Sequence, residues 1–385
     1  MNCLSFTLFN IRIKACITVF AWFMVLISPL NAESIKKPLL AASISKSTLA
    51  SSELFNREQV INVIVLKNYQ ELQKATQDLM ASMLYFCSDA QAKEHSKVQQ
   101  GFIKVRLAWA KAQMISFGPI SFLQRRERFD FWPDKHRVGE RQIRNLLNAP
   151  DQLPNNLESL QNKSVAVQGL GALERMLYAK SGFSVEKHCP LSILIVKNLA
   201  HIADEIFQQW AAEPILFKND LLNPQAGITY FSDINTVVSM IANDMTTQLR
   251  IVSDIKLARA LPKKGKASGN YKKLETWRTG LSFQLMQNNI STVQLFYELG
   301  FAESLSQIDL ALHKELNQLF ALSIKQLSDL DEQSQANLST AFNQTGFVEK
   351  INQVQQSIRQ IDQLIKTQLL PRYGLTLKFN ALDGD

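Results

Sequence analysis

Apolar residues recur at alternating spacings of three and four along most of this chain, and this spacing restricts its fold more than any other feature. Residues spaced in this way lie on one face of an α-helix, which packs against other helices. Runs that alternate with period two, as strands require, are nearly absent. The pattern therefore predicts an all-α protein. The plainest stripes are Leu72, Ala75, Leu79, Met83 and Phe86; Val98, Phe102, Val105, Trp109 and Ala112; and Ile351, Val354, Ile358, Ile361 and Ile365.

The expected helices are too many for one four-helix bundle, whereas two bundles of about 150 residues each account for the length. The segment 214–231, which contains Pro214, Pro224 and Gly227, is the expected boundary. We therefore predict two packed helical-bundle domains with up-down topology, over residues 54–220 and 221–385. The helices are expected over 57–88, 91–117, 135–148, 164–180, 190–213, 232–260, 280–299, 303–329, 333–343 and around 351–365.

The first 32 residues have the composition of an export signal. Arg12 and Lys14 precede an uncharged, mostly apolar run over 15–30, and Ala32 offers a small residue for cleavage. The run is shorter than the roughly 20 residues of a membrane-spanning helix. We predict a signal peptide over 1–32, a flexible leader over 33–53 and a periplasmic mature chain. An uncleaved anchor, and hence membrane association, is the alternative.

The charge is mildly basic and scattered. Removing the signal lowers the count of Lys and Arg from 42 to 40, while Asp and Glu stay at 34, so the formal net charge falls from +8 to +6. The densest basic cluster, Lys263, Lys264 and Lys266, lies in an expected loop. Because no basic stripe is interleaved with aromatic residues, nucleic acid is excluded as a partner. We expect a monomer.

Two of the four cysteines leave with the signal, and Cys87 and Cys189 remain. An exported chain meets an oxidising compartment, where two such cysteines are expected to form one disulfide. Two buried free thiols are the alternative. Two cysteines this far apart in sequence do not make a zinc site.

The hexapeptide Gly-Leu-Gly-Ala-Leu-Glu at 169–174 places a carboxylate beside the apolar face of the expected helix 164–180. Its two glycines, Gly169 and Gly171, would each cost about 1 kcal/mol inside a helix, unless another backbone or a ligand approaches closely. A buried Glu174 must be paired, protonated or bound to a cation. It is therefore either a metal or ligand carboxylate, or half of a structural ion pair with an arginine of a neighbouring helix.

The hexapeptide, with the Met-Leu pair that follows it, resembles the Gly-x-His-x-x-Glu signature of the imelysin-like proteins, the M75 peptidase group. Three other stretches are similar to the same family, in its branch of predicted periplasmic lipoproteins. They are 117–119 with 128–134 (Arg-Phe-Asp-Phe-Trp-Pro-Asp), 277–283 and 379–385. Cys87 and Cys189 also resemble the cysteine pair of that branch. The matches follow one another in order from about residue 60 to the end of the chain.

The resemblance implies two helical bundles with the signature near their interface, a bacterial cell-envelope location, and ties to iron uptake; the founding member was described as a peptidase. Gly171 stands where the family has its histidine, so one expected metal ligand is absent and a vacancy is expected beside Glu174. Positions 171 and 174 are i and i+3 on one helix face, where a histidine and a glutamate could share a metal. Glu174 is the remaining metal-ligand candidate, for a divalent metal or iron.

We predict ligand-binding residues in the matched motifs and no catalytic residue. Arg128 is expected to neutralise Glu174, because arginine can pair with a carboxylate bidentately; the alternative is that it lies on the surface of a loop. His201 and Glu205, at i and i+4, are either a two-ligand metal clamp or a solvated pair. Neither a Gly-x-Ser-x-Gly nor a His-Glu-x-x-His motif is present. The predicted ligand-binding set is Gly169, Gly171, Glu174, Arg128, Trp132, Asp134, Trp277 and Arg278.

The leading hypothesis is a periplasmic, non-enzymatic binding protein of the imelysin-like type, with an interdomain site around Glu174 and an accessory role in the uptake of iron or another metal. Its partner would be a small ligand or metal ion, with an envelope protein as a further candidate. One alternative is a metallopeptidase of the M75 type. The other is an interaction module whose glycine-lined groove receives a helix or peptide.

Overall fold

The computed structural model describes residues 54–88, 94–211, 216–229, 231–262 and 269–377. Every regular element within these ranges is a helix, which confirms the all-α prediction. The described helices belong to one compact unit, Thr48–Asp385. None of them combines the length and the apolar character that crossing a membrane requires. The predicted signal peptide, the leader and the motif at 379–385 lie outside the described residues.

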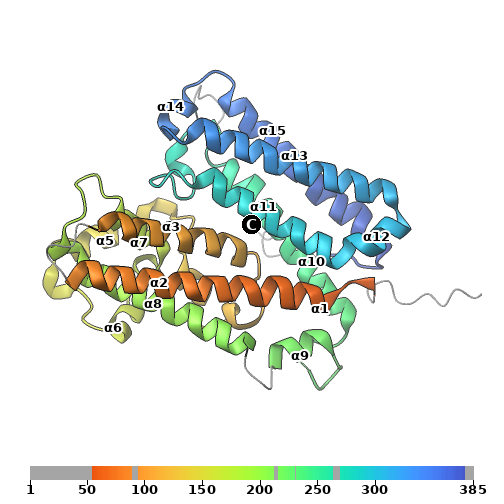
Figure 1. Cartoon of the computed structure of the whole chain (residues 1–385), viewed down its shortest axis with the longest axis horizontal. Coiled ribbons are helices and arrows are strands. Elements are labelled where there is room, and N and C mark those ends of the chain that lie inside the picture. The colour runs from red at the N-terminus through yellow and green to blue at the C-terminus, as the bar shows by residue number, and fades with distance from the viewer. Residues whose placement is uncertain (1–53, 89–93, 212–215, 230, 263–268, 378–385) are drawn as a thin grey trace, which may run out of the picture. The chain divides into compact units, whose positions relative to one another are not determined.

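The first set of helices is built around α2 (Lys67–Ser88), which packs against α3 (His95–Ala112) and α8 (Val185–Ala211) (Figure 1). A short helix α1 (Arg57–Gln59) leads into α2 through a π-helical segment, Val60–Leu66. All five residues of the stripe on α3 are buried, and so are Leu72, Leu79, Met83 and Phe86 of α2. The stripes therefore do face the core. The disulfide Cys87–Cys189 joins the end of α2 to α8, with Cα atoms 5.8 Å apart, which confirms the predicted pairing.

Short helices fill the connection between α3 and α8, and α7 packs against α3, α5 and α8. The expected helix over 164–180 is broken. A 3-10 turn covers Val165–Val167, Gly169 is an extended N-cap residue, and α7 begins at Leu170. Gly169 and Gly171 therefore lie in the cap and first turn, rather than in a helix interior. The short elements are Gly118–Ser121, α4 (Arg125–Phe129), Lys135–Arg137, α5 (Val138–Asn148), Pro150–Gln152, α6 (Leu157–Gln161) and α7 (Leu170–Leu177).

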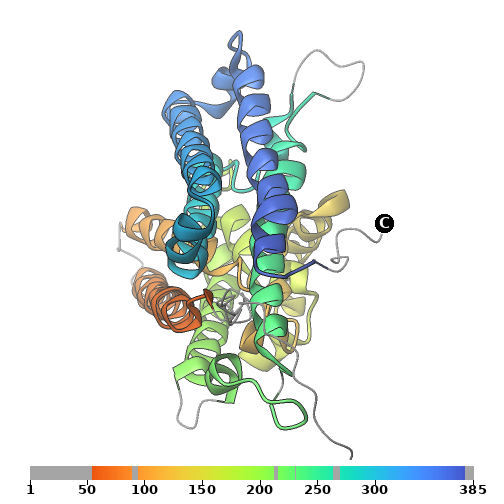
Figure 2. The same ribbon diagram turned by 90° about the vertical axis from the view of Figure 1, so that its right-hand side faces the viewer.

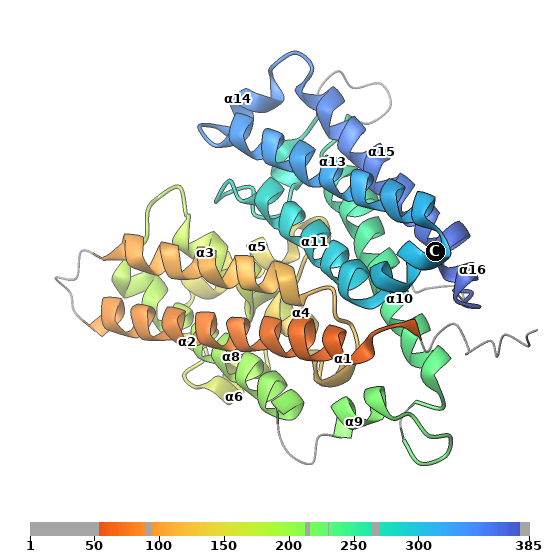
Figure 3. The ribbon, with the colours of Figure 1, turned by 45° about the vertical axis from the view of Figure 1, so that its right-hand side comes forward.

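The second set contains α10 (Ile234–Arg250), α11 (Ser282–Tyr297), α13 (Leu310–Ser334) and α15 (Phe347–Leu364). Figure 2 shows α13 and α15 running side by side, and all five residues of the last stripe are buried in this set. Helix α11 packs against both α13 and α3, so it joins the two sets (Figure 3). The remaining elements are α9 (Leu216–Leu222), Ile251–Leu257, Tyr271–Lys273, Glu298–Ala302, α12 (Glu303–Ile308), α14 (Leu338–Phe342), Ile365–Leu369 and α16 (Leu370–Arg372).

Both sets consist of helices packed on helices, as the spacing of the apolar residues predicts. The segment 214–231, which was expected to separate them, connects α8 to α10 and contains α9. A division into two domains at residue 220 stays a prediction.

Candidate functional site

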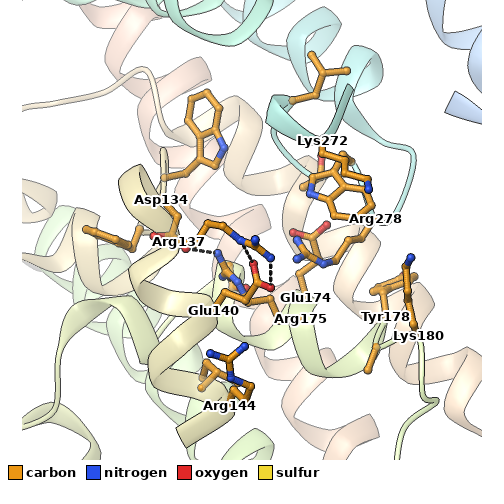
Figure 4. A pocket seen from close by; sticks show the side chains of 18 of the residues that line it. Asp134, Arg137, Glu140, Arg144, Glu174, Arg175, Tyr178, Lys180, Lys272 and Arg278 are labelled. Atoms are coloured by element: carbon orange, nitrogen blue, oxygen red, sulfur yellow. Dashed lines mark hydrogen bonds and ion pairs between the residues drawn. The ribbon is translucent and has the colours of Figure 1, made fainter. Parts of the chain in front are cut away.

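A cavity of about 1210 Å³ lies where α5, α7 and the loop before α5 meet the segment 270–278, which leads into α11. Six of the eight predicted ligand-binding residues line it, from three separate stretches of the chain. Figure 4 shows the side chains of α5 and α7 and those of the 270–278 segment converging on one space. The six residues are Trp132, Asp134, Gly171, Glu174, Trp277 and Arg278.

Glu174 lies in the second turn of α7 with 5% of its surface exposed. Its Oε1 atom is buried and has no hydrogen-bond partner among the described residues. Burial raises the pKa of Glu174, and the positive charges of Arg106, Arg278 and Arg175 partly oppose that rise. In Figure 4 the carboxylate lies toward Arg278, which comes from the opposite wall. Glu174 is therefore a buried carboxylate in the field of three arginines, without a direct ion pair in the described part of the chain.

The space beside Gly171 is occupied by Arg175. The guanidinium donates a hydrogen bond from Nη1 to the Gly171 carbonyl oxygen, and another from Nη2 to Asp134 Oδ2 at 2.7 Å. A Cβ atom built on Gly171 would lie 3.1 Å from Arg175 Nη1 and 3.7 Å from the Phe131 carbonyl oxygen. The expected vacancy is therefore filled by a cation, at the place where the family's histidine side chain would begin.

Gly169 allows two backbone segments to pack closely, and it does not line the cavity. A Cβ atom at this position would lie 2.3 Å from the Phe129 carbonyl oxygen and 2.6 Å from that of Arg128, so only glycine admits this close approach of two backbones. Asp134 Oδ1 accepts a hydrogen bond from the Gly139 amide at 3.2 Å. Asp134 thus supports the start of α5.

Arg128 does not pair with Glu174 and does not line the cavity. Its guanidinium donates to Gln168 Oε1 and to Asn198 Oδ1, both at 3.1 Å, so it faces α8. This corrects the expected Arg128–Glu174 pair: the arginines whose charges act on Glu174 are Arg106, Arg175 and Arg278.

Four buried charges, absent from the sequence-based set, connect the two sets of helices beside the cavity. Arg106 Nη1 lies 2.6 Å from Asp130 Oδ2, and Arg106 Nη2 lies 3.9 Å from Glu275 Oε1. Lys256 Nζ lies 2.6 Å from Glu275 Oε2. Burial raises the pKa of Asp130, which Arg106 opposes. Burial also acts to raise the pKa of Glu275, but Lys256 and Arg106 hold it below its usual value.

Features of the sequence could have identified Arg106 and Arg175 as residues close to Glu174. Arg106 stands four residues after Phe102 and so shares the buried face of α3, as conspicuous a position as that of Glu174. Arg175 is the next residue after the hexapeptide. Asp130 lies inside the matched stretch 128–134, but nothing in the sequence indicates that Asp130, rather than Arg128, faces inward.

The cavity lining is strongly basic: it contains ten Lys and Arg against four Asp and Glu. Some of these charges are paired with each other: Arg137 donates two hydrogen bonds to the Glu140 carboxylate, at 2.8 and 2.5 Å. Burial lowers the pKa of Arg278, and Glu174 partly offsets this effect. The excess of positive charge favours negatively charged solutes in this space.

The donor set does not fit the metal that the family resemblance implies. No group of three or more His, Cys, Asp and Glu that could hold a metal ion occurs among the described residues. Near Gly171 the carboxylates are Glu174, Asp130 and Asp134. The charges of three arginines act on Glu174, which disfavours the binding of a metal cation there. His201 and Glu205 are exposed on α8, with Nε2 and Oε1 3.5 Å apart, and Glu205 also pairs with Arg125 at 3.1 Å, which favours the solvated pair over the metal clamp.

The buried state of Glu174 predicts a pH-dependent effect of the substitution Glu174→Gln. Because burial raises the pKa above its ordinary value of 4.5, the folded chain holds this proton more tightly than the unfolded chain. Ionised Glu174 therefore reduces stability progressively as the pH rises above 4.5, until the pH passes the folded-state pKa. We expect Glu174→Gln to unfold at a higher urea concentration than the wild type at pH 8, and at an equal one at pH 4.

A matched control is Glu140→Gln. Hydrogen bonds from Arg137 hold the pKa of Glu140 below its ordinary value, so the ionised form is stabilising and the sign is opposite. Glu140→Gln should lose stability at pH 8 and not at low pH. Equal behaviour of the two variants would contradict the assignment of Glu174 as an unpaired buried carboxylate.

Known proteins share the sequence pattern and the fold of this chain. The sequence pattern of the family described as imelysin, peptidase M75, matches residues 65–365. The structure is similar to that of an imelysin-like protein from Psychrobacter arcticum 273-4, with a TM-score of 0.63 and 20% identity over 86% of this chain and 98% of that one. It is also similar to a putative iron-regulated protein A precursor from Parabacteroides distasonis ATCC 8503, with a TM-score of 0.68 and 12% identity over 84% and 96%. No curated protein matches the chain. The family pattern covers most of the chain, and the protein therefore belongs to the imelysin family.

Proposed function

We propose that this chain is an exported, periplasmic binding protein without enzymatic activity, and that it holds a small ligand in the cavity around Glu174. The observation that supports this function best is the buried, unpartnered Oε1 atom of Glu174 at the wall of a cavity of about 1210 Å³. Buried polar atoms are nearly always hydrogen-bonded in folded proteins, so this oxygen favours a site that a ligand or ordered water completes.

The peptidase alternative lacks support in the lining. A hydrolase needs an activated nucleophile or a metal-bound water. His188 lines the cavity, but its Nδ1 accepts a hydrogen bond from the Ser184 backbone amide at 2.8 Å rather than activating a hydroxyl group. Glu174 is the natural general base, yet the positive charges of the arginines around it disfavour a metal ion beside it.

An accessory role in iron acquisition belongs to the proposal. The Parabacteroides distasonis protein is named as iron-regulated and as a precursor, which supports both a link to iron and export. The basic lining argues that iron would not be bound as a bare cation.

The experiment uses protein expressed from the full chain. Thermal unfolding is followed with citrate, pyrophosphate, glucose, spermidine, Fe²⁺ and Zn²⁺ as separate probes. A solute present at about 100 times its Kd stabilises the fold by roughly 2.7 kcal/mol, so a bound probe raises the Tm measurably. We expect at least one probe to raise the Tm of the wild type and to have a weaker effect on Gly171→Leu, whose side chain would enter the cavity.

Lys97→Gln is the control, because Lys97 lies on the exposed face of α3 and pairs only with Glu94 in the described structure. It should respond to the probes as the wild type does. If no probe raises the Tm, the binding function is refuted. Chelator-sensitive cleavage of an unfolded polypeptide in the presence of Zn²⁺ or Fe²⁺ would instead establish the peptidase.

A further inference from the structure

We infer that the cavity around Glu174 takes a small polyanion, a molecule with two or more carboxylate or phosphate groups, or the iron chelate of such a molecule. This inference rests on the proposed binding function and names the chemical class of its ligand. It begins from the distribution of charge. The lining has six more positive than negative residues, which equals the formal net charge of +6 expected for the whole chain after residue 32. The rest of the chain after residue 32 therefore contains equal numbers of positive and negative residues.

Arg278 is the partly buried cation of the cavity lining that is best placed to bind an anion. Its guanidinium carbon lies 4.4 Å from the centre of the Trp277 ring, and stacking of this kind fixes the plane of the side chain. No carboxylate of the described residues lies within ion-pair distance of it, although Glu174 is near enough to raise its pKa. An oriented, unpaired and partly buried guanidinium is suited to bidentate binding of a carboxylate or phosphate.

Arg175 provides a second, more rigid cation on the facing wall. Its hydrogen bonds to Asp134 and to the Gly171 carbonyl oxygen hold the guanidinium in place beside Glu174. Because Asp134 offsets part of this charge, Arg175 alone is a weak anion site. Together with Arg278 it forms a pair of guanidinium groups on opposite sides of one carboxylate (Figure 4).

Further cations at the cavity mouth account for more than one acidic group on the ligand. Lys272 lies over the rings of Tyr271 and Trp277, at 5.8 and 6.0 Å, on the same wall as Arg278. Arg144 of α5 and Lys180, which follows α7, also line the cavity (Figure 4). None of these three has a carboxylate within ion-pair distance in the described chain. A monoanion satisfies only the inner arginines, whereas a polyanion also reaches this outer set.

Glu174 then acts as a selecting group rather than as a metal ligand. It is flanked by Arg106, Arg175 and Arg278, by Asp130, and by Tyr178 on its own helix. An anion among the arginines shields their field, so Glu174 takes up a proton and presents a neutral carboxyl group that can donate a hydrogen bond to the ligand. This arrangement repels a bare metal ion. It accepts iron only when carboxylates or phosphates enclose the metal in a complex of net negative charge, which reconciles the basic lining with a link to iron.

The test is calorimetric titration of the full-chain protein with citrate, ferric citrate and pyrophosphate, and with glucose, spermidine and Fe²⁺ as neutral and cationic probes. We expect a polyanion to bind, and its affinity to fall at least tenfold in Arg278→Gln and by a smaller factor in Lys272→Gln. Lys97→Gln removes the same charge elsewhere and should leave the affinity unchanged. Glu174→Gln should retain binding, because glutamine resembles the neutral acid, whereas loss of binding there would indicate a metal site.

The outcomes separate the inference from the proposed function. Binding of glucose, spermidine or Fe²⁺ without binding of any polyanion would leave the binding function intact and overturn the inference. Binding of none of the probes would overturn both. Equal loss of affinity in Arg278→Gln and Lys97→Gln would also overturn the inference, because the effect would then be general electrostatics. Tighter binding of ferric citrate than of citrate would identify the iron chelate as the source of the anionic groups, and the reverse order the free acid.

Discussion

Replacing Gly169 with alanine is expected to lower the free energy of unfolding by about 4 kcal/mol or more, whereas Gly171→Ala is expected to change it by less than about 1 kcal/mol. These glycines are only two positions apart, and both belong to the family signature. The difference arises from what each new methyl group would meet.

At Gly169 the obstruction is backbone. The Cβ atom would lie 2.3 Å from the carbonyl oxygen of Phe129, and neither of these two backbone segments can move without the other. The segment that would have to shift leads directly to Asp130, the buried partner of Arg106. At Gly171 the nearest atom is the far end of the Arg175 side chain, 3.1 Å away, which can swing aside. The helix propensity of alanine offsets the cost of that movement.

Urea denaturation followed by circular dichroism measures both variants on the same scale. The fluorescence of Trp109, which packs against Phe129 with 4.6 Å between ring centres, provides a local probe of the displaced segment. It should change in Gly169→Ala even under native conditions, and not in Gly171→Ala. Similar denaturation midpoints for the two variants would contradict the assignment of Gly169 to packing and Gly171 to the cavity.

The periodic features of the sequence were sufficient to predict the fold. All members of the stripes on α3 and on the last long helix are buried, because an apolar face of this length has no alternative to packing. Cys87 and Cys189 form the expected disulfide. The break before α7 was missed because the propensity cost of two glycines does not reveal that one of them lies in the cap, where a neighbouring backbone must pass.

Six of the eight residues predicted as ligand-binding line one cavity, but the predicted pairing of Arg128 with Glu174 was wrong. Short motifs far apart in the chain identified most of the cavity wall, but Arg128 was assigned to Glu174 because it shares a motif with other wall residues. Arg128 belongs to α4, a helix of five residues whose buried face contains Arg125 and Phe129. The packing of those two side chains turns Arg128 toward Asn198 on α8. The orientation of so short a helix depends on tertiary contacts that no local pattern encodes.

Removal of the Arg106 side chain is the second large effect that we expect. Arg106→Met should lower the free energy of unfolding by about 3–5 kcal/mol at pH 8, the range typical of breaking a buried ion pair on one side. Arg106 is 1% exposed, and its partners Asp130 and Glu275 are 4% and 2% exposed. Asp130 would remain as a buried carboxylate without a cation within ion-pair distance, whereas Glu275 would keep Lys256.

The pH dependence of this loss identifies its cause. The pKa of Asp130, already raised by burial, rises further when Arg106 is absent, because Arg106 is the cation that opposes the rise. Protonation then removes the uncompensated charge, so the destabilisation by Arg106→Met should decrease as the pH falls from 8 to 5. The double variant Arg106→Met/Asp130→Asn should recover part of the stability at pH 8, and its deficit should depend less on pH than that of the single variant.

Arg137→Met is the matched control, because Arg137 makes an equally short contact with Glu140 but is 76% exposed. Solvent screens such a pair, so its loss should lower the denaturation midpoint far less than Arg106→Met does. The substitution Arg106→Met should also affect the cavity, because Arg106 is one of the three arginines that oppose the rise in the pKa of Glu174. In Arg106→Met the pKa of Glu174 should therefore rise further, and the advantage of adding Glu174→Gln should be larger at pH 8 than in the wild-type background. Additive effects of the two substitutions would show that the buried charges and the cavity carboxylate are electrostatically independent, contrary to the geometry.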